Sequence, residues 1–374
     1  MKIEHFKMER MQSTWENVVE YNLSESGVHP LTLPEFLSGR ELEEIRSLSL
    51  GYSQSNGTPE LREQIARLYA GAGADCILVT NGSSEANFLL MWSLVEPGDE
   101  VVFMMPNYMQ MGGLVRNFGA TLKPLWLKES LGWAPDLNEL ETLVTPKTRL
   151  IIVTNPNNPT GAVLSREAMS AIIDRASRVG AWIVADEVYQ GAERTGETTP
   201  SFWGKYDRAV IVNGLSKAYG LPGLRIGWIV APSEFIMKTW PYHDYTTISP
   251  SALSDRIARI ALSPGIREKI IDRTRSIIRE NYVRLESWLK KQPELFSFIP
   301  PRAGAIAYVR YLLEINSTDL VTRLIHEKST LIVPGDHFEM DRYLRFGFGS
   351  EPAYLETGLG RVEELMAEIK RATR

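Results

Sequence analysis

Residues 149–189 read RLIIVTNPNNPTGAVLSREAMSAIIDRASRVGAWIVADEVY, and this stretch sets the expected architecture of the chain. It begins with an apolar run at 149–154 and ends with a second one at 182–185. Between them, residues 166–177 carry apolar side chains at helical spacing. Runs that are apolar on both faces are typical of a parallel sheet covered by helices. The stretch therefore predicts a strand, a helix and a second strand of an α/β domain.

The same alternation continues on both sides of this unit. Further apolar runs predict strands at 76–80, 100–104, 121–127, 209–213 and 226–230, with a helix at 85–94. Beyond residue 291, the predicted strands are 305–309, 330–333 and 343–348, and the predicted helices are 318–326 and 356–372. A charged amphipathic stretch at 264–291 lies between the two groups and has the length of a helix that joins two domains.

We therefore predict an α/β fold with a large domain, whose mostly parallel sheet is covered by helices, and a smaller α+β domain. The large domain is expected to span residues 46–280 and the small domain residues 281–374. Residues 1–45 are expected to pack with the small domain as an N-terminal segment.

Composition excludes several classes of protein. The chain has 374 residues, of which 44% are hydrophobic and 23% charged, as in ordinary globular proteins. A net charge of −5 disfavours nucleic-acid binding, which usually needs a basic face. No apolar run approaches 18 residues and no signal peptide is visible, so we expect no membrane span and a cytoplasmic location.

A metal site is also not expected. The chain has a single cysteine, Cys76, which we predict to be a buried strand residue because Ile77, Leu78 and Val79 follow it. One thiol cannot supply a zinc site of cysteines, and the five histidines lack the spacing of a metal-binding pair.

Candidate chemistry lies in the loops that follow the predicted strands, where open α/β sheets bind ligands. Residues 80–85 (TNGSSE) place Gly82, Ser83 and Ser84 at a helix start, where free N–H groups attract an anion such as phosphate. A serine there is also a common helix cap. Residues 155–161 (NPNNPTG) form a stiff loop that aims an amide side chain, such as that of Asn158, into a cleft.

Three further sites carry charged groups. Asp186 follows the apolar run 182–185, where a buried carboxylate needs a partner, and Tyr189 lies three residues on. Lys217, in the glycine-rich stretch 216–227, has Arg225 eight positions later. An apolar setting and a nearby cation favour the neutral amine, which is the form that attacks a carbonyl carbon. The fifth site is Arg345, an arginine between apolar strand residues that is a candidate for binding a carboxylate.

Together, these motifs resemble the class I/II aminotransferase family of fold-type I pyridoxal phosphate (PLP) enzymes. The resemblance rests on the Asn-Pro-Asn-Asn-Pro-Thr-Gly loop, the Asp-Glu-Val-Tyr motif and the Ser-Lys pair followed by Arg225, in this order and spacing. It extends from about Leu23 to the end of the chain and implies PLP as the cofactor. It also implies transfer of an amino group between an L-amino acid and a 2-oxo acid, on a homodimer with shared active sites.

The resemblance implies roles for single residues at the reacting centre. Lys217 would bind the cofactor covalently and, once released by the substrate, move the proton at the substrate Cα. Asp186 would pair with the pyridine nitrogen of the cofactor and favour its protonated form. Asn158 and Tyr189 would hydrogen-bond the phenolic oxygen of the cofactor. Arg345 would bind the α-carboxylate of the substrate.

Other roles concern the phosphate, the ring and the entrance to the site. The residues implied to hold the phosphate are Ser83, Ser84, Ser216 and Arg225, and Tyr108 corresponds to the aromatic residue that stacks on the cofactor ring. Tyr52 corresponds to a tyrosine that reaches the phosphate in the neighbouring subunit. Gly27 corresponds to a substrate-binding glycine of the N-terminal loop.

Two departures from the family pattern bear on the substrate. The N-terminal loop, at residues 24–30, reads SESGVHP instead of the usual Gly-x-Pro-Asp type, and no second arginine for a dicarboxylate can be placed. One hypothesis is that Glu25, in this acidic loop, contacts a cationic or polar substrate side chain. A third departure, Glu85 beside the phosphate loop, replaces a residue that often carries an amide.

Other readings stay open. The same motifs serve C–S β-lyases and enzymes that cyclise an amino-acid side chain, because the reaction depends on the leaving group and on the proton acceptor. A PLP-binding regulatory module is disfavoured, since only a short leader precedes Tyr52. A nicotinamide dehydrogenase is disfavoured because no G-x-G-x-x-G opens a helix after the first strand.

Overall fold

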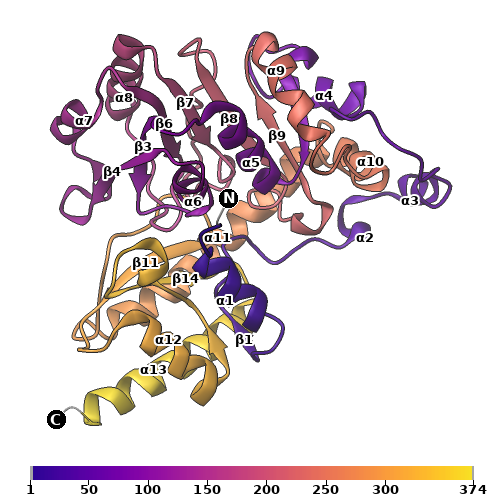
Figure 1. Ribbon diagram of the computed structural model, residues 1–374. Helices are drawn as coiled ribbons and strands as arrows, with labels where there is room; N and C mark the ends of the chain where they lie inside the picture. The colour runs from indigo at the N-terminus through magenta and orange to yellow at the C-terminus, as the bar shows by residue number, and fades with distance from the viewer. Residues whose placement is uncertain (1–2, 373–374) are drawn as a thin grey trace.

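The computed structural model describes residues 3–372 and has two lobes, with the large lobe drawn from purple through magenta to salmon and most of the small lobe in orange and yellow (Figure 1). Within the described residues, the large lobe contains an eight-stranded sheet. In spatial order its strands are β2 (Ile77–Asn81), β9 (Ile226–Val230), β8 (Ala209–Gly214), β7 (Trp182–Asp186), β6 (Thr148–Thr154), β3 (Glu100–Met105), β4 (Thr121–Lys128) and β5 (Ala134–Pro135).

The sheet is mostly parallel, as predicted. The strands β8, β7, β6, β3 and β4 pair in parallel, whereas β9 is antiparallel to both β8 and β2, and β5 is antiparallel to β4. Because β2 and β8 both oppose β9, β2 runs in the same direction as the parallel strands. The strands predicted from apolar runs in this lobe are confirmed, with bounds that differ by at most one residue.

Helices cover both faces of this sheet, which explains why its strands are apolar throughout. Along β6, Ile151 packs in one hydrophobic cluster with Ile172, and Ile152 packs in the opposite cluster with Leu89. The helices of the large lobe are α4 (Pro59–Ala66), α5 (Ser83–Leu94), α6 (Gln110–Asn117), α7 (Leu137–Leu143), α8 (Arg166–Val179), α9 (Ser233–His243) and α10 (Ala252–Ala261). The expected helix at 166–177 is thus α8, two residues longer.

The small lobe contains an antiparallel sheet in the order β10 (Phe296–Phe298), β11 (Ile306–Tyr311), β14 (Tyr343–Gly347) and β13 (Val333–Pro334). Its helices are α12 (Ser317–Lys328) and α13 (Pro352–Ala372). The stretch expected at 264–291 is one helix, α11 (Ile266–Lys290), which contacts α10 of the large lobe and α13 of the small lobe. The domain limit predicted between residues 280 and 281 falls inside this continuous helix; the domain limits stay a prediction.

The N-terminal segment lies along the small lobe. Helix α1 (Lys7–Trp15) and strand β1 (Tyr21–Asn22), drawn in indigo, run beside it in Figure 1, and β1 pairs in parallel with β12 (Thr330–Leu331). Two short helices, α2 (Leu33–Phe36) and α3 (Gly39–Arg46), then lead into the large lobe.

Two local predictions were wrong. Cys76 is half-buried and ends the 3₁₀ helix η1 (Ala74–Cys76), because its N–H closes a turn onto the carbonyl of Gly73 and the strand begins one residue later. The single strand expected at 330–333 is split at Ile332, because Thr330–Leu331 pairs with β1 and Val333–Pro334 pairs with β14.

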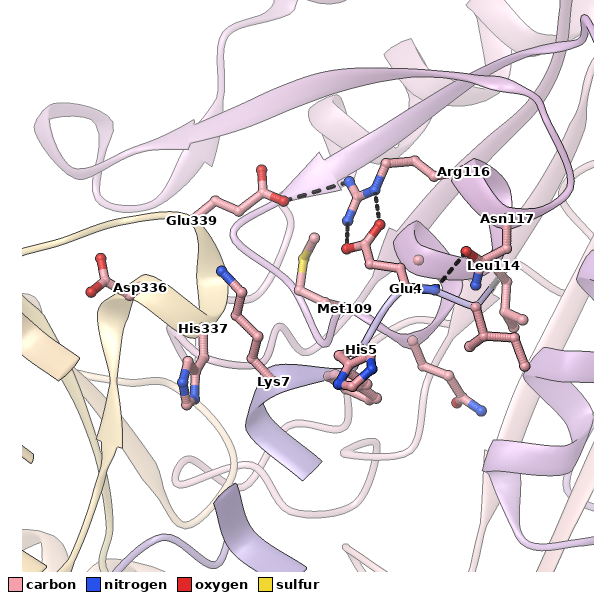
Figure 2. Close-up of a pocket in the computed structure, with 14 residues that line it drawn as sticks. Glu4, His5, Lys7, Met109, Leu114, Arg116, Asn117, Asp336, His337 and Glu339 are labelled. Carbon is pink, nitrogen blue, oxygen red and sulfur yellow. Dashed lines mark hydrogen bonds and ion pairs between the residues drawn. The ribbon is translucent and has the colours of Figure 1, made fainter. Parts of the chain in front are cut away.

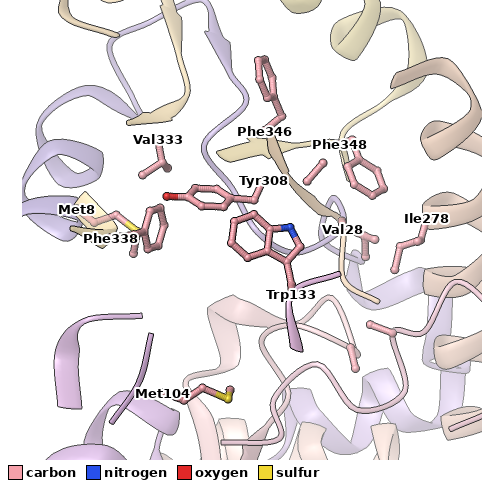
Figure 3. Close-up of a cluster of buried hydrophobic side chains, with 14 of the residues drawn as sticks. Met8, Val28, Met104, Trp133, Ile278, Tyr308, Val333, Phe338, Phe346 and Phe348 are labelled. Atoms are coloured by element: carbon pink, nitrogen blue, oxygen red, sulfur yellow. The ribbon is translucent and has the colours of Figure 1, made fainter. Parts of the chain in front are cut away.

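Aromatic side chains join the two lobes. Trp133, which directly precedes β5, is buried with its ring centroid 5.7 Å from those of both Tyr308 and Tyr343 of the small-lobe sheet. Figure 3 shows Trp133 beside Tyr308, with Phe338 and Met8 in the same cluster. This packing fixes the small-lobe sheet, and Arg345 on it, relative to the large sheet.

Among residues 3–372, no helix combines the length and apolar character that crossing a bilayer requires. In the same residues, no group of His, Cys, Asp and Glu side chains is arranged to hold a metal ion.

Candidate active site

The topology of the large sheet brings the predicted chemistry to one edge. The strands β2, β3, β6, β7 and β8 run in the same direction, so the loops that follow them meet at their carboxyl ends. These loops carry Ser83, Tyr108, Asn158, Tyr189 and Lys217. Because β9 runs the opposite way, its beginning lies at this edge too.

One cavity at this edge contains most of the sequence-predicted residues. Those that line it are Ser83, Ser84, Tyr108, Asn158, Tyr189, Ser216, Lys217, Arg225 and Arg345. The last of these comes from β14 of the small lobe, so both lobes form the cavity. Three predicted residues, Asp186, Gly27 and Tyr52, are not part of its lining.

An anion cradle forms where β2 turns into α5. Gly82 has a φ of 80° and is the N-cap of α5, so the free N–H groups of the first helical turn face the cavity edge at Ser83 and Ser84. The guanidinium of Arg225 lies against Gly82, where a Cβ atom would overlap it. Gly227 packs as closely on the backbone of Gly82 and Ser83. Glycine is therefore required at both positions for the cation to approach the helix terminus.

Asp186 is buried at the end of β7, with 4% of its surface exposed. One carboxylate oxygen accepts a hydrogen bond from the N–H of Val188 at 3.2 Å. Burial raises the pKa of Asp186 to about 6, although the Val188 N–H and the positive charge of Lys217 both lower it. A cation beside this carboxylate would offset its loss of solvation. A protonated pyridine nitrogen would be such a cation.

The loop after β6 is fixed by its own side chains. Asn157 donates to the carbonyl of Pro106 at 3.1 Å and accepts from the hydroxyl of Thr160, and Asn155 accepts from the N–H of Leu164. These bonds hold Asn158 in the cavity wall.

Tyr189 contributes a polar atom without a partner. Its side chain is 2% exposed, and its hydroxyl has no hydrogen-bond partner among the described residues, although it lines the cavity. A buried hydroxyl normally has a partner. An oxygen of a bound molecule, such as the phenolic oxygen of PLP, would supply one.

Arg345 is 1% exposed, which is unusual for an arginine. Its guanidinium donates to the side-chain oxygen of Asn158 at 3.0 Å and to the carbonyl of Ser24, and its Nε has no partner within the described part of the chain. Burial lowers the pKa of Arg345, whereas the nearby acidic groups raise it by a smaller amount. The side chain is thus held rigidly in the cavity and keeps a free donor for a carboxylate.

The N-terminal helix supplies residues that sequence reasoning missed. Met8, Glu9 and Gln12 of α1 line the cavity, as does Glu16 at its C-cap. Tyr108 donates its hydroxyl to Glu9 at 2.9 Å, and burial together with the charge of Glu9 raises the pKa of this phenol. The only sequence signal was the helical spacing of Met8, Met11 and Trp15, which does not reveal what the helix covers.

The remaining predicted residues lie near the cavity or apart from it. Gly27 packs on the backbone carbonyl of Ser216, and its neighbour Ser26 lines the cavity instead. Tyr52 is 93% exposed. Glu85 turns away and accepts hydrogen bonds from Asn81, Thr246 and Thr247, so it stabilises the loop beneath the cradle.

Comparison with known proteins connects this geometry to a family. A sequence model of "Aminotransferase class I and II" matches residues 27–362. The chain is 32% identical over 360 residues to capreomycidine synthase of Streptomyces vinaceus, covering 94% of this chain and 91% of that protein. Among solved structures, a PLP-dependent aminotransferase from Streptococcus suis superposes with a TM-score of 0.93 at 34% identity over 99% of both chains. A PLP-dependent cyclase, OrfR, superposes with a TM-score of 0.88 at 29% identity over 98% of both chains.

The match spans both lobes and includes every residue that lines the cavity except those before residue 27, which are Met8, Glu9, Gln12, Glu16, Glu25 and Ser26. The fold and the cofactor expected from the motifs are confirmed by these relatives. The chain belongs to the class I and II aminotransferase family and is a PLP-dependent enzyme of the fold-type I architecture.

Proposed function

We propose that this enzyme transfers the amino group of an L-amino acid to a 2-oxo acid. The observation that carries the proposal is the convergence of Lys217, Asn158, Tyr189 and Arg345 on one cavity, with Asp186 buried next to it. An amine, a buried acid and a carboxylate-binding arginine are the groups needed to labilise a Cα proton of an amino acid.

PLP, when bound, supplies an electron sink for the negative charge that develops at the substrate Cα. Lys217 would hold the cofactor through its Nζ and, once released by the substrate, would move the proton from the substrate Cα to C4′ of the cofactor. Asp186 would stabilise a positive charge on the ring nitrogen, and Asn158 and Tyr189 would donate to the phenolic oxygen.

The phosphate and the substrate carboxylate have separate binding groups. The phosphate would be held at the start of α5 by Ser83, Ser84, Ser216 and Arg225, and Tyr108 would cover the ring. Arg345 orients the substrate through its α-carboxylate.

We further propose a homodimer in which Tyr52 reaches the phosphate in the partner subunit. The support is the 93% exposure of Tyr52 together with the exposed apolar side chain of Leu50 beside it. Sedimentation should give twice the mass of one chain, and Tyr52→Phe should weaken PLP binding without changing the fold. A monomer with full PLP affinity contradicts this assembly.

A second candidate is cyclisation of an amino-acid side chain with retention of the amino group. It is favoured by the similarity to a capreomycidine synthase and to a PLP-dependent cyclase. Both reactions begin with removal of the Cα proton, so Lys217, Asp186 and Arg345 keep the same roles. They differ in where the electrons of the Cα carbanion go.

One experiment separates the two. The PLP-loaded enzyme is mixed with a panel of ¹⁵N-labelled amino acids, with no 2-oxo acid present. A transaminase forms one 2-oxo acid per active site and retains the label on the cofactor as its amine form. A cyclase releases a cyclic product that still contains the label and turns over repeatedly. Release of pyruvate and a thiol from a sulfur amino acid would identify a lyase and overturn both.

A further inference from the structure

One wall of the cavity is acidic, and its residues come from a single face of α1 and the loop after β1. Glu9, Gln12 and Glu16 lie at positions i, i+3 and i+7, which places them on the same side of a helix. All three line the cavity, and Glu25 lines it from the loop. We call Glu9, Glu16 and Glu25 the acidic wall.

The N-terminal segment is anchored at both ends, so the acidic wall has a defined position. Before α1, Glu4 accepts two hydrogen bonds from Arg116 of α6, each 2.7 Å long, and Arg116 also pairs with Glu339 at 3.5 Å. Figure 2 shows Arg116 between Glu4 and Glu339. After α1, Tyr21 pairs with Thr330 of the small lobe.

Hydrogen bonds also fix the acidic loop. Gln12 donates from its amide to the backbone and the hydroxyl of Ser24, at 3.1 and 3.0 Å. The carbonyl of Ser24 accepts from Arg345, and the backbone of Glu25 packs directly on Gly347 of β14, where a Cβ atom would overlap it. Glu25 is therefore held one residue from a group that contacts Arg345.

The cavity is lined by three acidic and three basic side chains, but these do not pair with one another. Among residues 3–372, no carboxylate of the acidic wall forms an ion pair. Burial, followed by the negative charges of Glu25 and Glu9, raises the pKa of Glu16, so Glu16 lies within electrostatic range of both other carboxylates. The basic residues of the cavity are Lys217, Arg225 and Arg345, and the proposed function assigns each of them to the cofactor or to the substrate carboxylate.

Two buried polar atoms in the same cavity show that it is built for a ligand. The Nε of Arg345 and the hydroxyl of Tyr189 lack partners within the described residues, in side chains that are 1% and 2% exposed. A carboxylate bound to Arg345 would lie beside α1, because Arg345 Nη1 lies 3.6 Å from the sulfur of Met8 on that helix.

From these observations we propose that the substrate is an amino acid with a cationic side chain, of the arginine or lysine type. Its α-carboxylate binds Arg345, and its guanidinium or ammonium group binds the acidic wall. This inference rests on the proposed role of Arg345, and it applies equally to amino transfer and to cyclisation.

The test uses the PLP-loaded enzyme and the variants Glu16→Gln and Glu25→Gln, singly and together. Each change keeps the size of the side chain and removes its charge. The control is Glu96→Gln, which makes the same charge change at an exposed site between α5 and β3. We expect kcat/KM for L-arginine or L-lysine to fall about ten- to hundredfold in the double variant, as for loss of charge-assisted hydrogen bonds. The value for L-norleucine should stay the same or rise.

A binding measurement is independent of the reaction. Calorimetry with 5-guanidinopentanoate, which has the carboxylate and the guanidinium but no amino group, should show tighter binding than heptanoate, and only in enzymes with an intact acidic wall. The inference is overturned if the variants lose affinity equally for both compounds, or if the parent enzyme does not bind 5-guanidinopentanoate more tightly than heptanoate. If the preference depends on the acidic wall but no labelled amino group is transferred, the substrate class stands and amino transfer is rejected.

Discussion

The guanidinium of Arg345 donates to the side-chain oxygen of Asn158 at 3.0 Å, across 187 residues of sequence. Asn158 lies at the carboxyl end of the large sheet, in the loop held by Asn155 and Asn157, and Arg345 lies on the central part of the small-lobe sheet. The bond therefore joins the residue proposed to contact the cofactor to the residue proposed to contact the substrate.

Replacing Arg345 tests the carboxylate role. Arg345→Ala should raise KM for α-amino acids about a hundredfold, because a charge-assisted bidentate contact is lost, while PLP affinity changes little. Arg345→Lys should not restore KM, since an ammonium cannot contact Asn158, Ser24 and a carboxylate in the same planar geometry. Steady-state kinetics and PLP titration measure both quantities. An unchanged KM contradicts the assignment.

Replacing Lys217 tests the covalent link to the cofactor. Lys217→Ala should reduce turnover at least about a thousandfold, because the group that moves the Cα proton is lost. Circular dichroism should show an unaltered fold. Borohydride treatment of the parent enzyme, followed by peptide mapping, should label Lys217. A label on another lysine would refute this role.

The close packing of the anion cradle can be tested with a matched pair of glycine substitutions. Gly227→Ala places a Cβ atom against the backbone of Gly82 and Ser83, so it should lower the free energy of unfolding by about 1–3 kcal/mol and weaken PLP binding. Gly223→Ala, two residues before Arg225, meets no atom within 4 Å and should leave both quantities unchanged. Chemical denaturation and PLP titration provide the comparison. Equal effects of the two changes would show that close packing is not the cause.

Glu187 predicts a pH dependence of stability. Its carboxyl is fully buried, accepts the N–H of Phe202 at 2.8 Å, and has a pKa raised by burial from 4.5 to about 8. Because the folded state holds this proton more tightly than the unfolded state, the free energy of unfolding should fall as pH rises from 4.5 to about 8. Glu187→Gln removes the titrating group, so its advantage over the parent in melting temperature should grow across this range. A difference in melting temperature between Glu187→Gln and the parent that is the same at all pH values would contradict the prediction.

Much of the active site could be predicted because its residues follow strands with a strong sequence signal. Asn158, Asp186 and Lys217 come directly after apolar runs, and parallel pairing then places such loops together. Arg345 stood out for a different reason, since a charged residue between apolar strand neighbours needs a partner.

The contribution of α1 could not be predicted, because it depends on contacts between distant segments. Nothing within residues 7–16 indicates that Glu9 accepts a hydrogen bond from Tyr108, 99 positions away. The split of the strand at 330–333 has the same origin. Its two halves are both buried, but they pair with different strands, β1 and β14.

The anchored N-terminal segment separates selectivity from reactivity along the chain. The acidic wall comes from the first 25 residues, whereas the groups proposed to act at the Cα and the ring lie between Tyr108 and Arg225. Substitutions at Glu16 or Glu25 would thus alter which amino acid enters, whereas Glu9 and Gln12 also hold Tyr108 and Ser24 in place. Chimeras that exchange only α1 and its loop between family members offer a route to redirecting such enzymes, and the same separation lets duplicated genes diverge in substrate while their chemistry stays intact.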